Sequence, residues 1–568
     1  MAKAKAKAKG SEPKYKVIKE TVMVPSRDGI GLAVDIYRPD ARGKFPALLA
    51  QSPYGKDAQV FESPPQPFGR SIFEASVESG NPFWYAERGY AYAIADFRGL
   101  GDSEGYHDGM MNYNECHTDG YDICEWLAKQ SWCDGGVGGA GICYFANAQL
   151  QLAASQPPSL KCIAPWEIYG DDLYKHGQYE GGVLNIFLYG LYTGTYPARC
   201  GYAITDRVRS AMQVAYESKP KELEKIVKKA MADPDLRQYP YLFHLLKYPQ
   251  KNPILFDFML NPLDGPYYRE RSVIERIKNI KVPTYVGGPF FSFFSEPQIN
   301  VWNRLPKSTP KKLRFYTDMG LRPWYHDHDE LLRWYDYWLK GIDTGIMDEE
   351  PVRYHVTGLE KWRTCKQFPV ETMKYEPFYL NSLQALGREP DLYNDEPDAF
   401  VQSPLFVSEE RAFVRYVSPP LAEPMQCTGA PRIKFYAAID QKDTCWRVNV
   451  RVFGDDAIYP LAQGWLKASL RKRDYDRDVP WEIEHDYTAF DYPKKGEIYE
   501  YELQMRPMSH MFKAGDRIQL EISCIDIPVE FETYDIYWHV VPATTTLHKI
   551  YRDADHQSVL MLPVVPMK

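Results

Sequence analysis

Short apolar runs alternate with helical patterns over residues 15–165. The runs at 47–50 and 91–95 are apolar throughout, and each leads into a loop rich in glycine, proline and charge. Strands that are buried on both faces of a parallel sheet have this character. Similar runs return at 282–286 and 313–316. The pattern therefore predicts an α/β domain with a parallel sheet, in which the loops after the strands carry the chemistry.

Two further patterns interrupt and follow this domain. Residues 169–277 are rich in aromatic residues and carry helical segments, which predicts a helical cap inserted over the edge of the sheet. From about residue 352, period-two runs separated by turn residues predict a β-sandwich of the jelly-roll kind. The clearest single elements are predicted helices at 220–232, 239–246 and 331–340, and predicted strands at 447–453, 499–505 and 517–522.

These patterns divide the chain into four parts. The first is a basic arm, residues 1–14, whose alternating lysines leave no apolar face to bury, so we expect it to be disordered. The α/β domain then takes residues 15–168 and 278–350, the helical cap 169–277, and the jelly roll 351–568. The predicted fold class is an α/β core with an inserted helical cap and a C-terminal β jelly-roll sandwich.

The composition excludes several classes of protein. Of the 568 residues, 44% are hydrophobic and 25% are charged, as in an ordinary globular chain. The net charge is -8 and no cluster of Lys and Arg interleaves with aromatic residues, which argues against a nucleic-acid partner. No run approaches the length of a membrane span and no secretory leader is visible, so we expect a cytoplasmic protein without a membrane partner.

Cysteine spacing gives no sign of a metal site. The ten cysteines include neither a CxxC pair nor zinc-ligand spacing, so we expect no metal and no cofactor. Most of the thiols should be reduced and buried.

One cysteine, Cys143, stands in a distinctive context. Within 135–158, small residues that predict a strand lead into the sequence GICY at 141–144, and a helix rich in Ala and Leu follows. This order is typical of a nucleophile elbow, a sharp strand-to-helix turn that exposes one side chain beside the first amides of the helix. Phe145 stands where a second glycine is usual, so a buried structural cysteine is the alternative.

Sequence blocks on both sides of the elbow resemble one known family. Residues 98–105 read RGLGDSEG, residues 125–132 read EWLAKQSW, and residues 333–345 read RWYDYWLKGIDTG. Their order and spacing are similar to those of the cocaine esterase and X-prolyl dipeptidyl peptidase-like (CocE/NonD) hydrolases. Further similar blocks lie at 119–122, 421–429, 464–471 and 510–517, so that the resemblance covers nearly the whole chain.

The resemblance implies an α/β-hydrolase core and acyl transfer from an ester or amide to a serine at the elbow, with a histidine base and an orienting aspartate. Cys143 occupies the serine position. The oxyanion hole of the family combines a tyrosine hydroxyl from a Ser-Pro-Tyr motif with the amide after the nucleophile. In this chain those groups are Tyr54 and the amide of Tyr144.

The resemblance also places the base in the loop ahead of the last helix of the core. Residues 322–328 read RPWYHDH, and two histidines compete there. His326 fits the family spacing Pro-Trp-x-His, whereas His328 fits related chains in which the histidine directly precedes Asp-Glu. We favour His326, and the choice stays open.

The orienting acid is where the chain departs from the family pattern. After the predicted strand at 282–286, the sequence GGPFFSFFSE has no carboxylate in the expected place. Either Ser292 orients the histidine, or Glu296 reaches back, or the third member is absent. A thiol tolerates such a loss better than a hydroxyl, because its pKa near 8.5 falls beside an imidazolium and at a helix N-terminus.

The sequence therefore predicts a hydrolase that acts on a carboxylic ester, amide or thioester through Cys143 and an S-acyl enzyme. Transfer of the acyl group to an acceptor other than water, as in an acyltransferase or cyclase, is one alternative. A non-catalytic, ligand-binding member of the fold is another, and a cysteine introduced by engineering is a third.

Aromatic residues predict the substrate pocket. We expect Phe290, Phe291, Phe294 and Trp324 to form apolar walls for a small-molecule acyl substrate. The identity of the substrate and the oligomeric state, monomer or homodimer, stay open.

Overall fold

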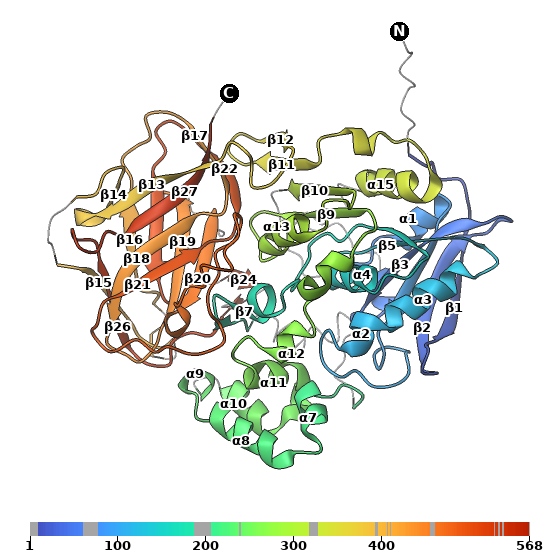
Figure 1. The fold of residues 1–568 in the computed structure, drawn as a ribbon, viewed down its shortest axis with the longest axis horizontal. Helices are drawn as coiled ribbons and strands as arrows, with labels where there is room; N and C mark the ends of the chain where they lie inside the picture. Colours follow the sequence, from blue (N-terminus) through green and yellow to red (C-terminus); the bar gives the residue numbers. More distant parts are fainter. Residues whose placement is uncertain are drawn as a thin grey trace, which may run out of the picture.

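The computed structural model describes residues 10–60, 78–186, 206–237, 240–316, 328–391, 396–405, 407–408, 410–454, 460–526, 529–531, 534–536 and 539–566. These residues form an α/β core, a helical cap and a C-terminal β-sandwich (Figure 1). No helix within these ranges is both long and apolar enough to cross a bilayer.

A mixed sheet forms the centre of the core (Figure 1). Its middle strands, from β4 to β11, are parallel, whereas β1, β2 and β12 join antiparallel at the two edges. In spatial order the strands are β1 (Val17–Pro25), β2 (Gly31–Pro39), β4 (Ala91–Asp96), β3 (Phe45–Ser52), β5 (Cys133–Gly139), β6 (Leu160–Ile163), β9 (Thr284–Pro289), β10 (Lys311–Tyr316), β11 (Val352–Val356) and β12 (Lys361–Cys365).

Alternate residues of the central strands enter two apolar clusters, one on each face of the sheet. Leu48 and Ala50 of β3 belong to the first cluster, and Ala47 and Leu49 belong to the second. Apolar side chains of α1 (Pro82–Glu87) and α15 (His328–Lys340) join the first cluster. Those of α3 (Asp119–Ala128) and α13 (Ser295–Arg304) join the second, and α4 (Tyr144–Ala154) contributes to both.

The cap lies between β6 and β9 in the chain and below the sheet in Figure 1. Its buried apolar residues, among them Met212, Leu245 and Phe258, join the same cluster as Cys143. The cap therefore covers the face of the core that carries the elbow. Its elements are α7 (Ala211–Tyr216), α8 (Pro220–Ala230), α9 (Pro234–Arg237), α10 (Pro240–Lys247), α11 (Pro253–Leu260) and α12 (Pro266–Arg269).

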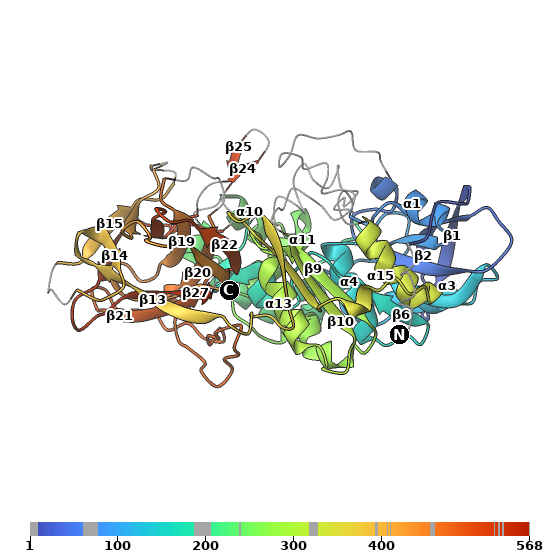
Figure 2. The same cartoon turned by 90° about the horizontal axis from the view of Figure 1, so that it is seen from above.

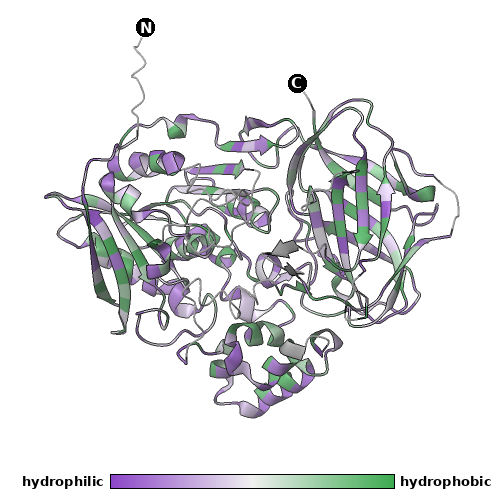
Figure 3. Cartoon of the chain, turned by 180° about the vertical axis from the view of Figure 1, so that it is seen from behind, coloured by the Kyte–Doolittle hydropathy of each residue, from purple (hydrophilic) through white to green (hydrophobic). Residues whose placement is uncertain are grey.

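The C-terminal domain is built mainly from antiparallel strands and lies beside the core (Figures 1 and 2). Polar and apolar residues alternate along these strands, which appear striped in Figure 3, and the apolar side chains form a third cluster. The longer strands are β13 (Lys374–Asn381), β18 (Arg432–Ile439), β19 (Cys445–Val452), β20 (Ala462–Lys467), β21 (Tyr499–Gln504), β22 (Met508–Phe512), β23 (Ile518–Ser523), β26 (Thr546–Tyr551) and β27 (Val559–Val565).

The structure confirms the predicted fold class and the elements named above, and it corrects two boundaries. Strands β11 and β12 continue the core sheet, so the core extends to Cys365 rather than ending at residue 350. The arm is not disordered along its whole length, because the amide and hydroxyl of Ser11 both donate to Asp336 of α15. Residues 1–9 of the arm lie outside the described ranges.

Gly287 allows the segments beside the elbow to pack closely. A Cβ atom on Gly287 of β9 would lie 2.4 Å from the buried Trp166 indole. We expect Gly287→Ala to lower the free energy of unfolding by about 1 to 3 kcal/mol, as other overpacked cores do. Thermal unfolding measures this loss, and Gly265→Ala, which meets nothing within 4 Å, is the matched control. Equal melting temperatures would contradict the expectation.

Candidate functional site

Cys143 lies at a sharp turn between β5 and α4. Its backbone has φ 58° and ψ -121°, a conformation that costs a residue with a side chain roughly 1 to 3 kcal/mol. Two residues earlier, Gly141 has φ 106°, and a Cβ there would lie 2.4 Å from the Cβ of Phe145. Only glycine fits that position. The structure thus has the elbow geometry that the sequence predicts.

Neighbouring backbone groups hold this strained residue in place. The Cys143 amide donates to the Trp166 carbonyl at 3.2 Å, and the Cys143 carbonyl accepts from Ala146 and Asn147 of α4. The Ile142 amide donates to the carbonyl of Glu78 at 2.9 Å. Cys143 itself is buried, with 9% of its surface exposed, and belongs to the apolar cluster on this face of the sheet.

A buried carboxyl group anchors the residue that follows Cys143. The Tyr144 hydroxyl donates to Glu115 at 2.8 Å, and the Met111 amide donates to both groups. Burial raises the pKa of Glu115 to about 8 despite the hydrogen bond from Tyr144. The Nδ1 atom of the buried His107 lies 3.4 Å from the same carboxyl. This anchor was not predicted, because nothing in the local sequence sets Glu115 apart from other acidic residues of a helix.

Tyr54 lies beside the elbow, as the proposed oxyanion donor must. Its ring, 3% exposed, meets the Tyr144 ring edge to face at a centroid distance of 6.0 Å. The loop of Tyr54 is fixed by Lys56, whose amide donates to Asp96 at 2.7 Å and whose ammonium pairs with Asp102 at 2.6 Å. Tyr54 thus packs against the two residues that follow Cys143, whereas the role of Tyr54 and Tyr144 as oxyanion donors stays a prediction.

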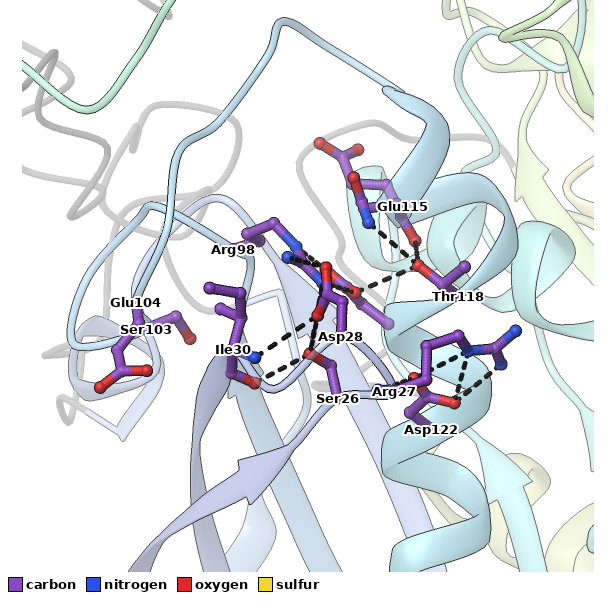
Figure 4. Close-up of polar contacts among 12 residues, drawn as sticks. Ser26, Arg27, Asp28, Ile30, Arg98, Ser103, Glu104, Glu115, Thr118 and Asp122 are labelled. Carbon is purple, nitrogen blue, oxygen red and sulfur yellow. Dashed lines mark hydrogen bonds and ion pairs between the residues drawn. The ribbon is translucent and has the colours of Figure 1, made fainter.

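A second set of charges fixes the neighbouring loop. The Arg98 guanidinium lies between Asp28 of the β1–β2 turn and Asp119 of α3, with contacts of 2.7 and 2.6 Å. Figure 4 shows Arg98 and Asp28 pointing toward each other, beside the pair Arg27 and Asp122. Within the motif at 98–105, Arg98 thus ties the β1–β2 turn to α3, and Asp102 pairs with Lys56 of the loop that carries Tyr54.

Of the two candidate histidines, only His328 lies within the described residues. His328 begins α15, and its ring stacks on Trp84 at 4.8 Å and meets Tyr85 edge to face. Burial, with help from Arg88, lowers its pKa to about 4. His326 lies outside the described residues.

The two candidate orienting groups on the β9 side have other partners. The Ser292 hydroxyl accepts from the Phe294 amide at 3.2 Å and so closes the turn before α13. Glu296 lines a small cavity of about 60 Å³ together with His176, Glu180 and Arg506. Burial raises the pKa of Glu296 to about 7. Glu296 therefore belongs to a polar cluster between the core and the sandwich.

The predicted aromatic pocket is only partly supported. Phe294 is buried in the same apolar cluster as Cys143 and Tyr54. Phe290 is wrong as a pocket residue, because it stacks on Phe315 at 4.3 Å in the cluster on the other face of the sheet. Phe291 is wrong for a similar reason, since it packs between that cluster and the sandwich. Trp324 lies outside the described residues.

Comparisons with known proteins give one consistent result. The family of X-Pro dipeptidyl-peptidases (S15 family) matches residues 28–328, and the X-Pro dipeptidyl-peptidase C-terminal non-catalytic domain matches residues 344–561. Cocaine esterase of Rhodococcus sp. (strain MB1 Bresler) is 24% identical, over 96% of this chain and 98% of its own length. A putative Xaa-Pro dipeptidyl-peptidase of Bacillus anthracis is 22% identical, over 89% and 82%.

A solved structure extends the likeness to the fold. The crystal structure of a CocE/NonD family hydrolase from Staphylococcus aureus superimposes with a TM-score of 0.75 at 21% identity. The match covers 97% of this chain and 94% of that one. Core, cap and sandwich therefore follow one arrangement in both chains.

The raised pKa of Glu115 makes stability depend on pH. An ordinary glutamate has a pKa near 4.3, so Glu115 loses its proton at a lower pH in the unfolded chain than in the folded chain. The contribution of Glu115 to stability is full below about pH 4.3 and is lost as the pH rises toward 8. Glutamine does not titrate. We therefore expect Glu115→Gln to gain at least about 2 kcal/mol relative to wild type between pH 5 and pH 8.

Urea unfolding of both proteins at several pH values measures this difference. Parallel curves for wild type and Glu115→Gln across this range would show that Glu115 titrates normally.

Proposed function

The chain belongs to the X-Pro dipeptidyl-peptidase (S15) family and is a hydrolase of the ester and peptide type, and we propose that it cleaves its substrate through Cys143 and an S-acyl enzyme. The observation that carries the proposal is the strained backbone of Cys143 at the elbow. Strain of this kind persists where a side chain must be held in one place, as at a catalytic nucleophile.

The reaction has two halves. The Cys143 thiolate attacks the carbonyl carbon, a C–S bond forms, and the π electrons move to oxygen, where the Tyr54 hydroxyl and the Tyr144 amide donate hydrogen bonds. The bond to the leaving group then breaks, and a histidine returns the thiol proton to the departing oxygen, nitrogen or sulfur. In the second half water, deprotonated by the same histidine, attacks the thioester and releases the acid and the thiol.

The site supports a thiolate at neutral pH. Cys143 is the N-cap of α4, where the first amides of the helix point outward and the helix dipole favours negative charge. An adjacent imidazolium stabilises the thiolate further. Because the thiolate forms before attack, it needs less help from a base than a serine hydroxyl does.

The base comes from the pair His326 and His328. The ring of His328 stacks on Trp84, and burial lowers its pKa to about 4, so this imidazole resists the charge that a base must carry. These features support His326. A small-molecule acyl substrate then binds on the face that the cap covers, where Phe294 and Tyr54 share a cluster with Cys143.

The reactivity of Cys143 tests the proposal directly. We expect iodoacetamide at pH 7 to alkylate Cys143 at least about tenfold faster than the other thiols, because only a thiolate reacts. Cys116, whose pKa burial raises to about 12, is the internal comparison. Mass spectrometry of the digested chain gives both rates.

Removal of the thiol is the second arm of this test. We expect Cys143→Ala to lower kcat/KM for simple aryl esters at least about 10³-fold, as loss of a nucleophile does elsewhere. Cys116→Ala is the matched control. Undiminished turnover by Cys143→Ala would refute the proposal.

The oxyanion role of Tyr54 gives a separate prediction. We expect Tyr54→Phe to lower kcat by about 10²- to 10³-fold with little change in KM, because the hydrogen bond strengthens only in the transition state. Tyr375→Phe, which removes a hydroxyl bonded to Ala430 in the sandwich, is the control. Steady-state kinetics measures both, and a kcat within twofold of wild type would exclude Tyr54 as a donor.

A further inference from the structure

The segment after β9 lacks the carboxylate that orients the histidine in the family, so an orienting acid has to come from elsewhere. Four neighbouring parallel strands, in the order β5, β6, β9 and β10, end at the same edge of the sheet. Cys143 follows β5, and both candidate histidines follow β10. Between β5 and β10 lie β6 and β9. An acid that serves the histidine can therefore reach this space from the end of β6 as well as from the end of β9.

The segment after β6 is tied to the elbow. Trp166 forms bridges with Ile142 on one side and with Gly287 of β9 on the other. Its carbonyl accepts the Cys143 amide at 3.2 Å. The indole ring is fully buried and lies against Gly287. The residue after Trp166 thus starts from a fixed position beside the nucleophile.

That residue is Glu167. Its amide donates to the Gly287 carbonyl at 2.7 Å, and its side chain is 1% exposed. The backbone has φ 54°, in the left-handed region that glutamate rarely adopts. The carboxyl accepts a hydrogen bond of 2.6 Å from the hydroxyl of Tyr316, the last residue of β10.

This hydrogen bond locates the carboxyl group. Glu167 follows β6 and Tyr316 ends β10, with β9 between them. Neighbouring strands lie about 4.8 Å apart, so the contact spans roughly 10 Å across the end of β9. The carboxyl therefore lies over the end of β9, where the segment 287–292 supplies no acid of its own.

We propose that Glu167 is the acidic positioning residue of the site, a carboxylate that accepts a hydrogen bond from the imidazole serving Cys143. It fixes the tautomer whose other nitrogen faces the sulfur, and it stabilises the imidazolium while that ring holds the thiol proton. No proton passes to Glu167. The assignment rests on the proposed function, since it needs Cys143 to act as the nucleophile.

With Glu167 in this role, the segment after β9 needs no carboxylate to orient the histidine. The Ser292 hydroxyl is engaged by the Phe294 amide, and Glu296 faces a cavity shared with His176 and Arg506. Among the contacts of the described residues, neither of these two groups is tied to the elbow as Glu167 is through Trp166.

The test uses Glu167→Gln, which keeps an oxygen for the Tyr316 hydroxyl but removes the charge. We expect kcat/KM for simple aryl esters to fall about 10²- to 10⁴-fold, up to the loss seen when a triad aspartate becomes an amide. The pH profile of Cys143 alkylation should move upward by about one unit, because the imidazolium that favours the thiolate loses its partner. A purely structural defect would leave that profile in place.

Two further kinds of variant complete the design. Tyr316→Phe removes only the hydroxyl that positions the carboxylate, so we expect a smaller fall, about three- to thirtyfold, with the profile moved in the same direction. Ser292→Ala and Glu296→Gln are the matched controls and should stay within about threefold of wild type. If Glu167→Gln fails to fold, as judged by circular dichroism, Tyr316→Phe decides alone.

The outcomes distinguish failure of the Glu167 assignment from failure of the proposed function. Rapid alkylation of Cys143 with the same pH profile in wild type, Glu167→Gln and Tyr316→Phe would overturn the assignment of Glu167 and leave the proposed function intact. A shift produced by Ser292→Ala or Glu296→Gln instead would reassign the role to that residue. If wild-type Cys143 reacts no faster than Cys116, the proposed function fails, and the assignment fails with it.

Discussion

The strained backbone of Cys143 is the constraint on which the rest of the site depends. A residue with a side chain does not keep φ 58° and ψ -121° unless its neighbours impose it. Here the Trp166 carbonyl holds the amide and α4 holds the carbonyl. The nearby glycines, Gly141 and Gly287, allow the close approaches that this requires. The packing of β5, β6 and β9 thus determines where the thiol is presented.

Around the elbow, the buried cations and the buried carboxyl of Glu115 have different roles. Lys56 is paired with Asp102 and fixes the loop of Tyr54, whereas Arg98 is paired with Asp28 and Asp119 and joins the β1–β2 turn to α3. Glu115, by contrast, has a carboxyl whose pKa is raised to about 8 by burial, so it holds Tyr144 largely as a neutral group at pH 7. Glu115 thus anchors Tyr144 without a buried charge beside the elbow.

The sequence predicts well what is local. Strands at 47–50 and 91–95 and the elbow at 141–144 were predictable because apolar runs and glycines record them directly. The side of the sheet that Phe290 faces was not, since a shift of one position in a strand exchanges the two faces. Glu167 was missed for a different reason. Glu167 comes close to Tyr316 because β6, β9 and β10 are neighbours in the sheet, and the local sequence around Glu167 does not indicate this order of strands.

The position of the acid is less restricted than the position of the nucleophile. In the proposed mechanism the sulfur attacks along one direction, which fits an elbow with a strained residue, two close-packed glycines and a helix N-terminus. An orienting carboxylate needs only to reach one nitrogen of an imidazole. Side chains from the ends of adjacent strands, such as β6 and β9, differ in origin by about 5 Å, within the length of a glutamate side chain. A longer acid from β6 can thus replace a shorter one from β9. A thiol site, which depends less on the acid, tolerates that exchange better than a serine site.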